Sequence, residues 1–300
     1  MYVVTGATGN TGNVVAKNLL AQGKKVRAIG RSLAKLQALT AAGVEPFVAD
    51  VTDAEALTKA FKGAEAVYAM IPPNITSQNP NADQEKIGKA IATAVQNAGV
   101  KFVVSLSSIG ADKSENSGPV VGLHNQEQRL NKIEGLNVLH LRAGFFMENT
   151  LAQIGVIKAT GAAGAPLRPD LKLPLIATRD IGTAAAEELT RLEFKGKQTH
   201  ELQGPRDLSF AEATAIIGRA IGKPDLKYVQ LPDNAVRAAM VQMGMSQNMA
   251  DLILELDAAL NSGHVRALEP RTARNSTPTS YENFVAEEFL PQYKQQSVAA

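Results

Sequence analysis

The first segment that could do chemistry is TGATGNTG, from Thr5 to Gly12. Its three glycines, Gly6, Gly9 and Gly12, recur every third residue and follow the apolar run YVV. A strand must end and a helix begin within this stretch. Gly6 then permits a tight turn, Gly9 lets the backbone approach a pyrophosphate, and Gly12 lets the helix pack against the strand.

The expected phosphate ligands are the backbone N–H groups where this helix begins. We expect Thr8, Asn10 and Thr11, with the three glycines, to surround the phosphates in the positive field of the helix N-terminus. The spacing is GxxGxxG rather than GxGxxG, and a glycine triplet alone also fits a turn that binds no ligand. The strand before the turn and the helix after it favour dinucleotide binding.

The residue after the second predicted strand bears on which dinucleotide binds. Chains that bind NAD usually carry Asp or Glu there, whereas this chain has Arg31. A guanidinium can hold a 2′-phosphate through paired hydrogen bonds, and a carboxylate would repel it. We therefore hypothesise NADPH (NADP) in preference to NADH. The alternative is that Arg31 is a solvated surface arginine.

Two further strand ends are expected to contact the nucleotide. Asp50 follows the third predicted strand, where it could accept a hydrogen bond from the adenine amino group while Val51 packs on the ring. The alternative role for Asp50 is capping of a local turn. Ile71 and Pro72 end the fourth predicted strand, where the backbone would flank the adenosine ribose and the pyrophosphate.

The residues above are positioned by strands and helices that we expect to alternate along the first half of the chain. The expected strands are 2–6, 25–30, 45–50, 64–71, 101–108 and 136–142, and the expected helices are 11–22, 32–42, 53–61, 81–97 and 122–132. The strands are continuously apolar, which indicates that both faces of the sheet are covered. This alternation predicts an α/β fold with a Rossmann-type doubly wound parallel sheet.

The alternation ends near residue 143, which sets the expected domain boundary. We assign residues 1–143 to an NAD(P)-binding Rossmann domain. Residues 144–300 should form a smaller, mainly helical C-terminal region that covers the substrate cleft and is interleaved with the sheet. Its expected strands are 171–176 and 198–204, and its expected helices are 179–192, 210–221 and 233–260.

Composition narrows the class of protein. The chain of 300 residues is 45% apolar and 20% charged, with a net charge of +2 and no basic block, so we expect neither nucleic acid nor a membrane as a partner. It has no cysteine, and its four histidines are far apart in sequence, so we expect no metal. It shows no signal segment and no apolar run near the roughly 20 residues that span a bilayer. We expect a cytoplasmic protein.

Several motifs taken together resemble a known family. They are TGATGNTG, the arginine after the second strand, LSSIGA, LRAGFFMEN, ATRDIGTAAAE and PRTARNSTPTSYENFVAEEF. Over roughly residues 2–290 the chain resembles the NmrA-like group of atypical short-chain dehydrogenases/reductases, in particular its NAD(P)H-dependent quinone oxidoreductase type 2 and azoreductase-like members. That family also contains reductases of plant phenolics and catalytically silent proteins that sense the redox state of the dinucleotide.

The resemblance implies a catalytic site that this chain carries only in part. Short-chain dehydrogenases typically use a serine and a Tyr-x-x-x-Lys pair, in which the lysine lowers the tyrosine pKa. No tyrosine occurs between Tyr68 and Tyr228, and GLHNQEQRL stands where the pair is expected. We take His124 and Ser108 as catalytic candidates and Ser107 as a cofactor contact. The alternatives are a helix cap or surface residue for His124 and backbone capping for both serines.

The resemblance also places the motif AGFFMEN beside the nicotinamide. Phe145 and Phe146 could stack on a flat aromatic substrate or close the core, and Asn149 is a polar candidate with a helix N-terminal role as its alternative. The function that follows is NADPH-dependent hydride transfer to a quinone or a similar flat, electron-poor acceptor, for which orientation by the protein could suffice. The alternative is a non-catalytic redox sensor or regulator that acts through a protein partner. Either function is compatible with an oligomer.

Overall fold

The computed structural model describes residues 1–298 of the chain. Seven strands form one sheet in the order β10-β6-β5-β4-β1-β2-β3, and every neighbouring pair in it is parallel. The strands are β1 (Tyr2–Val4), β2 (Val26–Gly30), β3 (Glu45–Val48), β4 (Ala66–Ala69), β5 (Phe102–Ser108), β6 (Asn137–Ala143) and β10 (Lys197–Leu202). The strand order reverses between β1 and β4, and ligands bind at such a switch point in doubly wound sheets. The predicted Rossmann-type fold is confirmed.

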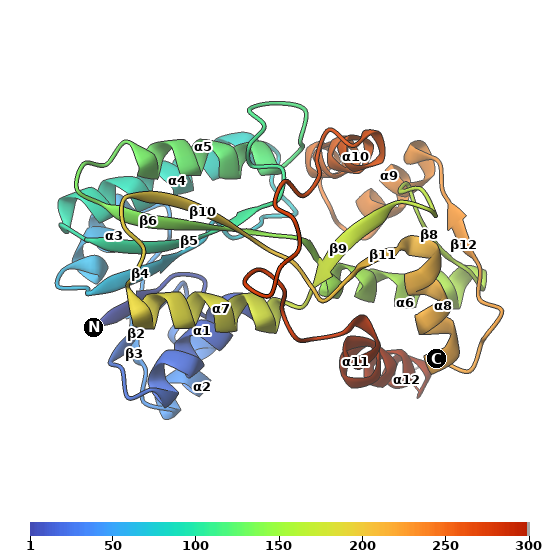
Figure 1. Cartoon of the computed structure of the whole chain (residues 1–300), viewed down its shortest axis with the longest axis horizontal. Coiled ribbons are helices and arrows are strands. Elements are labelled where there is room, and N and C mark those ends of the chain that lie inside the picture. The colour runs from blue at the N-terminus through green and yellow to red at the C-terminus, as the bar shows by residue number, and fades with distance from the viewer. Residues whose placement is uncertain (299–300) are drawn as a thin grey trace.

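Helices cover both faces of this sheet (Figure 1). One face is covered by α1 (Asn10–Ala21), α2 (Leu33–Ala41) and α7 (Thr178–Arg191), and the other by α3 (Ala54–Phe61), α4 (Pro80–Asn97) and α5 (Val120–Asn131). Each layer encloses its own buried apolar core against the sheet. The strands are therefore buried on both sides, which is why their sequences read as continuous apolar runs.

The other elements form a second lobe around a third apolar core. A small sheet has the order β11-β9-β7, and two further strands, β8 and β12, pair in parallel. The strands are β7 (Phe145–Phe146), β8 (Ala163–Ala165), β9 (Lys172–Ile176), β11 (Asp207–Ser209) and β12 (Tyr228–Gln230). The helices are the 3₁₀ segment η1 (Met147–Ala152), α6 (Gln153–Thr160), α8 (Phe210–Ala220), α9 (Asp233–Gln242), α10 (Gln247–Ser262), α11 (Tyr281–Phe284), the π-helical turn η2 (Val285–Phe289) and α12 (Leu290–Val298).

The chain passes between the two lobes more than once. After β9 it returns through α7 and β10 to the seven-stranded sheet, and it then leaves again through β11. The single helix predicted over 233–260 is wrong. Gly244 has a φ of +93° and separates α9 from α10, and the Ser246 hydroxyl caps α10 by accepting the Met249 N–H.

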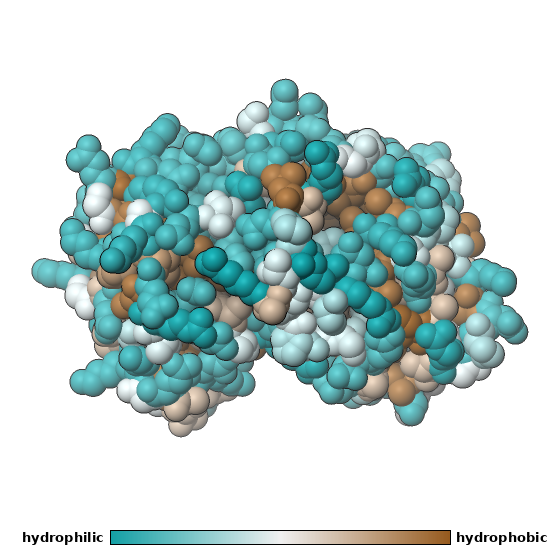
Figure 2. Space-filling view, viewed as in Figure 1, coloured by the Kyte–Doolittle hydropathy of each residue, from teal (hydrophilic) through white to brown (hydrophobic). Residues whose placement is uncertain are grey.

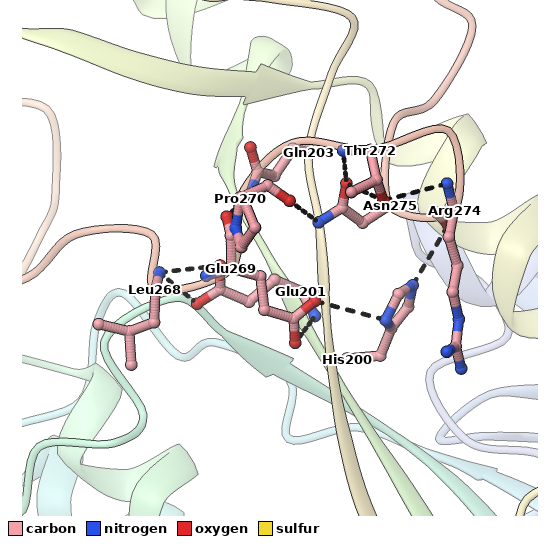
Figure 3. A network of polar contacts seen from close by, with 9 residues as sticks. All are labelled: His200, Glu201, Gln203, Leu268, Glu269, Pro270, Thr272, Arg274 and Asn275. Atoms are coloured by element: carbon pink, nitrogen blue, oxygen red, sulfur yellow. Dashed lines mark hydrogen bonds and ion pairs between the residues drawn. The ribbon is translucent and has the colours of Figure 1, made fainter.

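Residues 263–280, here called the strap, join α10 to α11 and lie along the edge strand β10 (Figure 3). The Glu201 carboxylate, 2% exposed, accepts the backbone N–H groups of Leu268 and Glu269. Farther along, the N–H of Gln203 donates to the carbonyl of Asn275 at 2.8 Å. The strap thus covers backbone groups that an edge strand would otherwise expose.

Gly12 allows a direct test of how closely α1 approaches β1. A Cβ at this position would overlap the carbonyl oxygen of Gly6, which is backbone and cannot rotate away. We expect Gly12→Ala to lower the free energy of unfolding by about 1–3 kcal/mol, measured by urea denaturation. The control is Gly155→Ala in α6, where a Cβ meets no atom within 4 Å and where alanine favours the helix. Equal stabilities of the two variants would contradict the close approach.

Candidate functional site

The glycine turn lies at the carboxyl end of β1, at the switch point of the sheet. Gly6 adopts a φ of +61°, and the N–H of Gly9 donates to the Gly6 carbonyl at 2.9 Å, which closes the turn. The first backbone hydrogen bond of α1 runs from the Asn13 N–H to the Gly9 carbonyl. The N–H groups of residues 10–12 lie ahead of that bond and have no acceptor within residues 1–298.

These N–H groups form a set of donors at the positive end of α1. The first turn of the helix carries no acidic side chain that could occupy them, and Thr8, Gly9 and Asn10 are exposed. Thr11 differs, because its buried hydroxyl accepts a hydrogen bond from Tyr68 at 2.9 Å. Thr11 can therefore offer a ligand only its backbone. An anion such as a phosphate group fits this arrangement.

Arg31 follows β2, the neighbour of β1, and is exposed. It makes no hydrogen bond or ion pair within the described part of the chain. The pKa of Asp50 is lowered, first by the N–H of Thr52, which donates to its Oδ1 at 2.8 Å, and further by the positive charge of Arg31. Asp50 therefore caps a turn with one oxygen, and the Arg31 guanidinium remains able to bind an anionic group.

The other residues expected at the nucleotide serve partly as core. Ile71 is buried, and Val51 packs against the core under α3 and α4. Pro72 is half-buried. The ends of β1 and β4 are joined by the Thr5 hydroxyl, which accepts the N–H of Met70 at 2.9 Å. At this edge of the sheet, backbone groups are therefore more available to a ligand than side chains are.

Ser107 belongs to a buried ionic network. Its hydroxyl donates to Glu127 Oε1 at 2.6 Å, and the Arg142 guanidinium donates to both oxygens of Glu127, at 2.9 and 2.6 Å. Glu127 lies on α5 and is 2% exposed. The Ser107 side chain thus points toward the α5 side of the sheet, and only its backbone is left for a cofactor. Sequence reasoning missed Glu127 and Arg142, although an arginine within the apolar run LNVLHLR was a signal.

The two catalytic candidates make backbone contacts. The Ser108 hydroxyl donates to the carbonyl of Ile109 at 2.9 Å, and His124 Nδ1 lies 2.9 Å from the carbonyl of Ala111. Since a carbonyl only accepts, Nδ1 must carry a proton, and the neutral ring then presents Nε2 as an acceptor. Neutral His124 can receive a proton at Nε2 but cannot donate one there.

Phe145 and Phe146 point to opposite sides of β7. Phe145 packs against the core of the second lobe and meets Phe210 edge to face, with ring centroids 5.7 Å apart. Phe146 packs against the core under α1 and α7. At most one of the two can therefore stack on a flat ligand. Asn149 is exposed and lies inside η1 rather than at its start.

Within residues 1–298, no three side chains among His, Asp and Glu come together in a way that could hold a metal ion. No described helix combines the length and the apolar character needed to cross a membrane.

Comparison with known proteins identifies the family to which the chain belongs. The model of the NmrA-like family matches residues 2–290, and the chain belongs to this family, as its motifs predicted. It is 32% identical to the NAD(P)H azoreductase of Xenophilus azovorans over 260 residues, 86% of each chain. The structure resembles NADPH-dependent quinone oxidoreductase QOR2 of Escherichia coli complexed with NADPH, with a TM-score of 0.82 and 26% identity over 96% of this chain and 100% of that one.

The fold is also shared with a regulator. NmrA, a negative transcriptional regulator in complex with NADP, has a TM-score of 0.77 at 18% identity, with 98% of this chain and 97% of that chain covered. At this identity the likeness concerns the fold alone.

The buried ion pair can be tested through stability. Arg142→Met leaves the Glu127 carboxylate buried and uncompensated, and we expect it to lower the free energy of unfolding by about 3–5 kcal/mol. The control is Arg191→Met, which removes an exposed pair with Glu187 on α7 and should cost less than about 1 kcal/mol. Urea denaturation measures both, and a small effect of Arg142→Met would show that the network is not held by this pair.

Proposed function

We propose that the chain is an NADPH-dependent oxidoreductase that transfers a hydride to a quinone or a similar flat, electron-poor acceptor. The observation that carries the proposal is the donor set of residues 10–12 with the exposed Arg31 beside it. The azoreductase and the quinone oxidoreductase named above, with their stated dependence on NAD(P)H and NADPH, support the same activity.

The residues present suit the pyrophosphate and the adenosine part of NADPH. The N–H groups of residues 10–12 would hold the pyrophosphate, and Arg31 would hold the 2′-phosphate. Asp50 and Val51 would border the adenine, and the backbone of residues 71–72 would follow the ribose. When bound, NADPH supplies the hydride. In this arrangement the chain contributes binding and orientation of the cofactor through backbone and one guanidinium.

The proton and the hydride would come from different sources. Ser107 is engaged by Glu127, and neutral His124 has no N–H at Nε2 to give. A reduced quinone carries negative oxygen, which takes its proton from water or from His124 in its protonated form. A ketone, which needs a strong acid at the moment of hydride transfer, is a poorer substrate for such a site.

One observation favours a second function, that of a redox sensor. The position where short-chain dehydrogenases use Tyr-x-x-x-Lys holds residues without that acid–base pair. A sensor must bind the oxidised and reduced dinucleotide with different affinities and pass the difference to a protein partner, because a ligand shifts an equilibrium only by its differential affinity.

Arg31 is the test of cofactor choice. We expect Arg31→Glu to weaken NADPH binding by about 10–100-fold, since it removes a charge-assisted contact with the 2′-phosphate. NADH binding should change by less than about twofold, because NADH lacks that phosphate. Lys17→Glu, an equal charge change at an exposed position farther along α1, serves as the control. Titration calorimetry measures all the affinities. Equal losses for the two cofactors in Arg31→Glu would contradict the assignment.

Turnover distinguishes the two functions. We expect steady oxidation of NADPH in the presence of benzoquinones or naphthoquinones, followed by the loss of NADPH absorbance. If NADPH binds tightly and no acceptor is reduced, the reductase is excluded. Unequal affinities for NADPH and NADP⁺ would then support the sensor.

A further inference from the structure

The helix α7 begins beside the glycine turn. Asn18 of α1 donates to the Thr183 hydroxyl at 3.2 Å, and the Thr190 hydroxyl donates to Gln22, just past the end of α1, at 2.8 Å. Positions that advance along α1 therefore meet positions that advance along α7, so the two helices run in the same direction on one face of the sheet (Figure 1). Both N-termini lie at the edge of the sheet where residues 10–12 form their donor set.

The two helix N-termini differ in what already occupies them. The first N–H of α7, that of Thr178, donates to Glu148 Oε1 at 2.9 Å, and the Thr178 hydroxyl donates to the same oxygen at 2.5 Å. A carboxylate of the chain itself thus occupies the positive end of α7. The N-terminus of α1 has no capping side chain and no acid in its first turn. An anion between the two helix ends therefore depends on the donors of α1 and on side chains.

Arg179 lies on the face of α7 that meets α1. It belongs to the motif ATRDIGTAAAE, for which the nucleotide site has so far given no role. Gly182, where a Cβ would come within 2.8 Å of the Thr11 carbonyl oxygen, follows three residues later, and residues three apart share a helix face. At about 1.5 Å per residue, Arg179 lies about 4.5 Å nearer the N-terminal end than Gly182 does. Because Thr11 is only the second residue of α1, Arg179 is level with the glycine turn.

The Arg179 guanidinium is bound to the second lobe and to the strap. Its Nη1 donates to Glu287 Oε2 at 2.6 Å, and its Nε donates to the Thr279 hydroxyl at 3.2 Å. Its Nη2 makes no hydrogen bond with another residue of the range 1–298. The ion pair is open to solvent, with 38% of the Arg179 side chain and 54% of the Glu287 side chain exposed. Exposed pairs contribute little to stability, so the guanidinium can change its partner at small cost.

The beginning of α7 lies where the two lobes meet at the surface. Figure 2 shows that the outline of the molecule is indented between the lobes at its lower edge, and Figure 1 places the start of α7 near this indentation. A pyrophosphate bound at α1 carries more negative charge than one carboxylate, and a guanidinium binds phosphate oxygens through paired N–H groups. The pyrophosphate is then a stronger partner for Arg179 than Glu287 is.

We propose that Arg179 is a second arginine of the dinucleotide site, and that it exchanges its ion pair with Glu287 for one with the pyrophosphate when the dinucleotide binds. The N–H groups of residues 10–12 bind the pyrophosphate from the end of α1, and Arg179 binds it from the side of α7. The exchange releases one contact between the lobes, because Glu287 lies on η2 of the second lobe. The proposal deepens the proposed function and rests on it in taking the pyrophosphate to lie at the N-terminus of α1.

Two variants that each remove one charge of the pair should have opposite effects. Arg179→Gln should weaken the binding of both NADPH and NADH about tenfold, since the pyrophosphate is common to them. This separates it from Arg31→Glu, which should weaken NADPH alone. Glu287→Gln should tighten the binding of both dinucleotides about two- to fivefold, because the competing carboxylate is gone. Titration calorimetry measures all the affinities.

A purely structural role for the pair gives a different pattern. If the pair only holds the lobes together, both variants break the same contact and shift the affinity in the same direction, which would overturn the proposal. An unchanged affinity in Arg179→Gln would overturn it too. Arg179→Lys keeps the charge and should retain part of the affinity that Arg179→Gln loses.

The control is Arg206→Gln, which breaks an exposed ion pair with Glu282 in the second lobe. It should change neither affinity, and a loss equal to that in Arg179→Gln would contradict a specific role for Arg179. Urea denaturation should give Arg179→Gln and Arg206→Gln stabilities close to that of the wild type, because both pairs are exposed.

The result is separable from the proposed function. If NADPH binds and Arg31→Glu weakens it selectively while Arg179→Gln has no effect, the proposed cofactor stands and the role of Arg179 fails. If the wild-type chain binds neither dinucleotide, the proposed function itself fails. Quinone turnover by the wild type is measured independently of both variants.

Discussion

The nucleotide end of the molecule depends on the close approach of α1 to its neighbours. A Cβ at Gly12 would overlap the carbonyl of Gly6. On the other side of α1, a Cβ at Gly182 of α7 would come within 2.8 Å of the Thr11 carbonyl. Glycine at both positions lets α1 pack tightly against the turn that follows β1 and against α7 beside it on the same face of the sheet. The N-terminus of α1 is thereby fixed at the switch point, and the N–H groups of residues 10–12 have no acceptor within the described residues.

The strand ends near the N-terminus of α1 differ in the charged side chains that they carry. The exposed Arg31 favours an anion at the end of β2. At the end of β5 the pair of Glu127 and Arg142 is enclosed, and it takes up the Ser107 hydroxyl. Burying two charges is costly unless they are well paired, and here the pairing is bidentate. The stretch GLHNQEQRL, where the resemblance led us to expect the acid–base pair, thus contributes Glu127 to a structural network.

The sequence predicted the large sheet because two independent signals agreed, the continuous apolar runs and the glycine turn. It did not predict β7, β8 and β12, because strands of two or three residues carry too little periodicity. The break at Gly244 was missed because methionine and glutamine, which favour helix, stand on both sides of it. The residues proposed at the nucleotide could be chosen from the sequence because they follow strand ends directly, and they remain a prediction. The direction of the Ser107 hydroxyl was not, because Glu127 lies 20 residues away and approaches only in the folded chain.

A crystal structure with NADPH bound tests the central claim most directly. The account predicts that the pyrophosphate accepts hydrogen bonds from the N–H groups of residues 10–12 and that the 2′-phosphate contacts the Arg31 guanidinium. A dinucleotide bound elsewhere, or a 2′-phosphate in solvent away from Arg31, would contradict it.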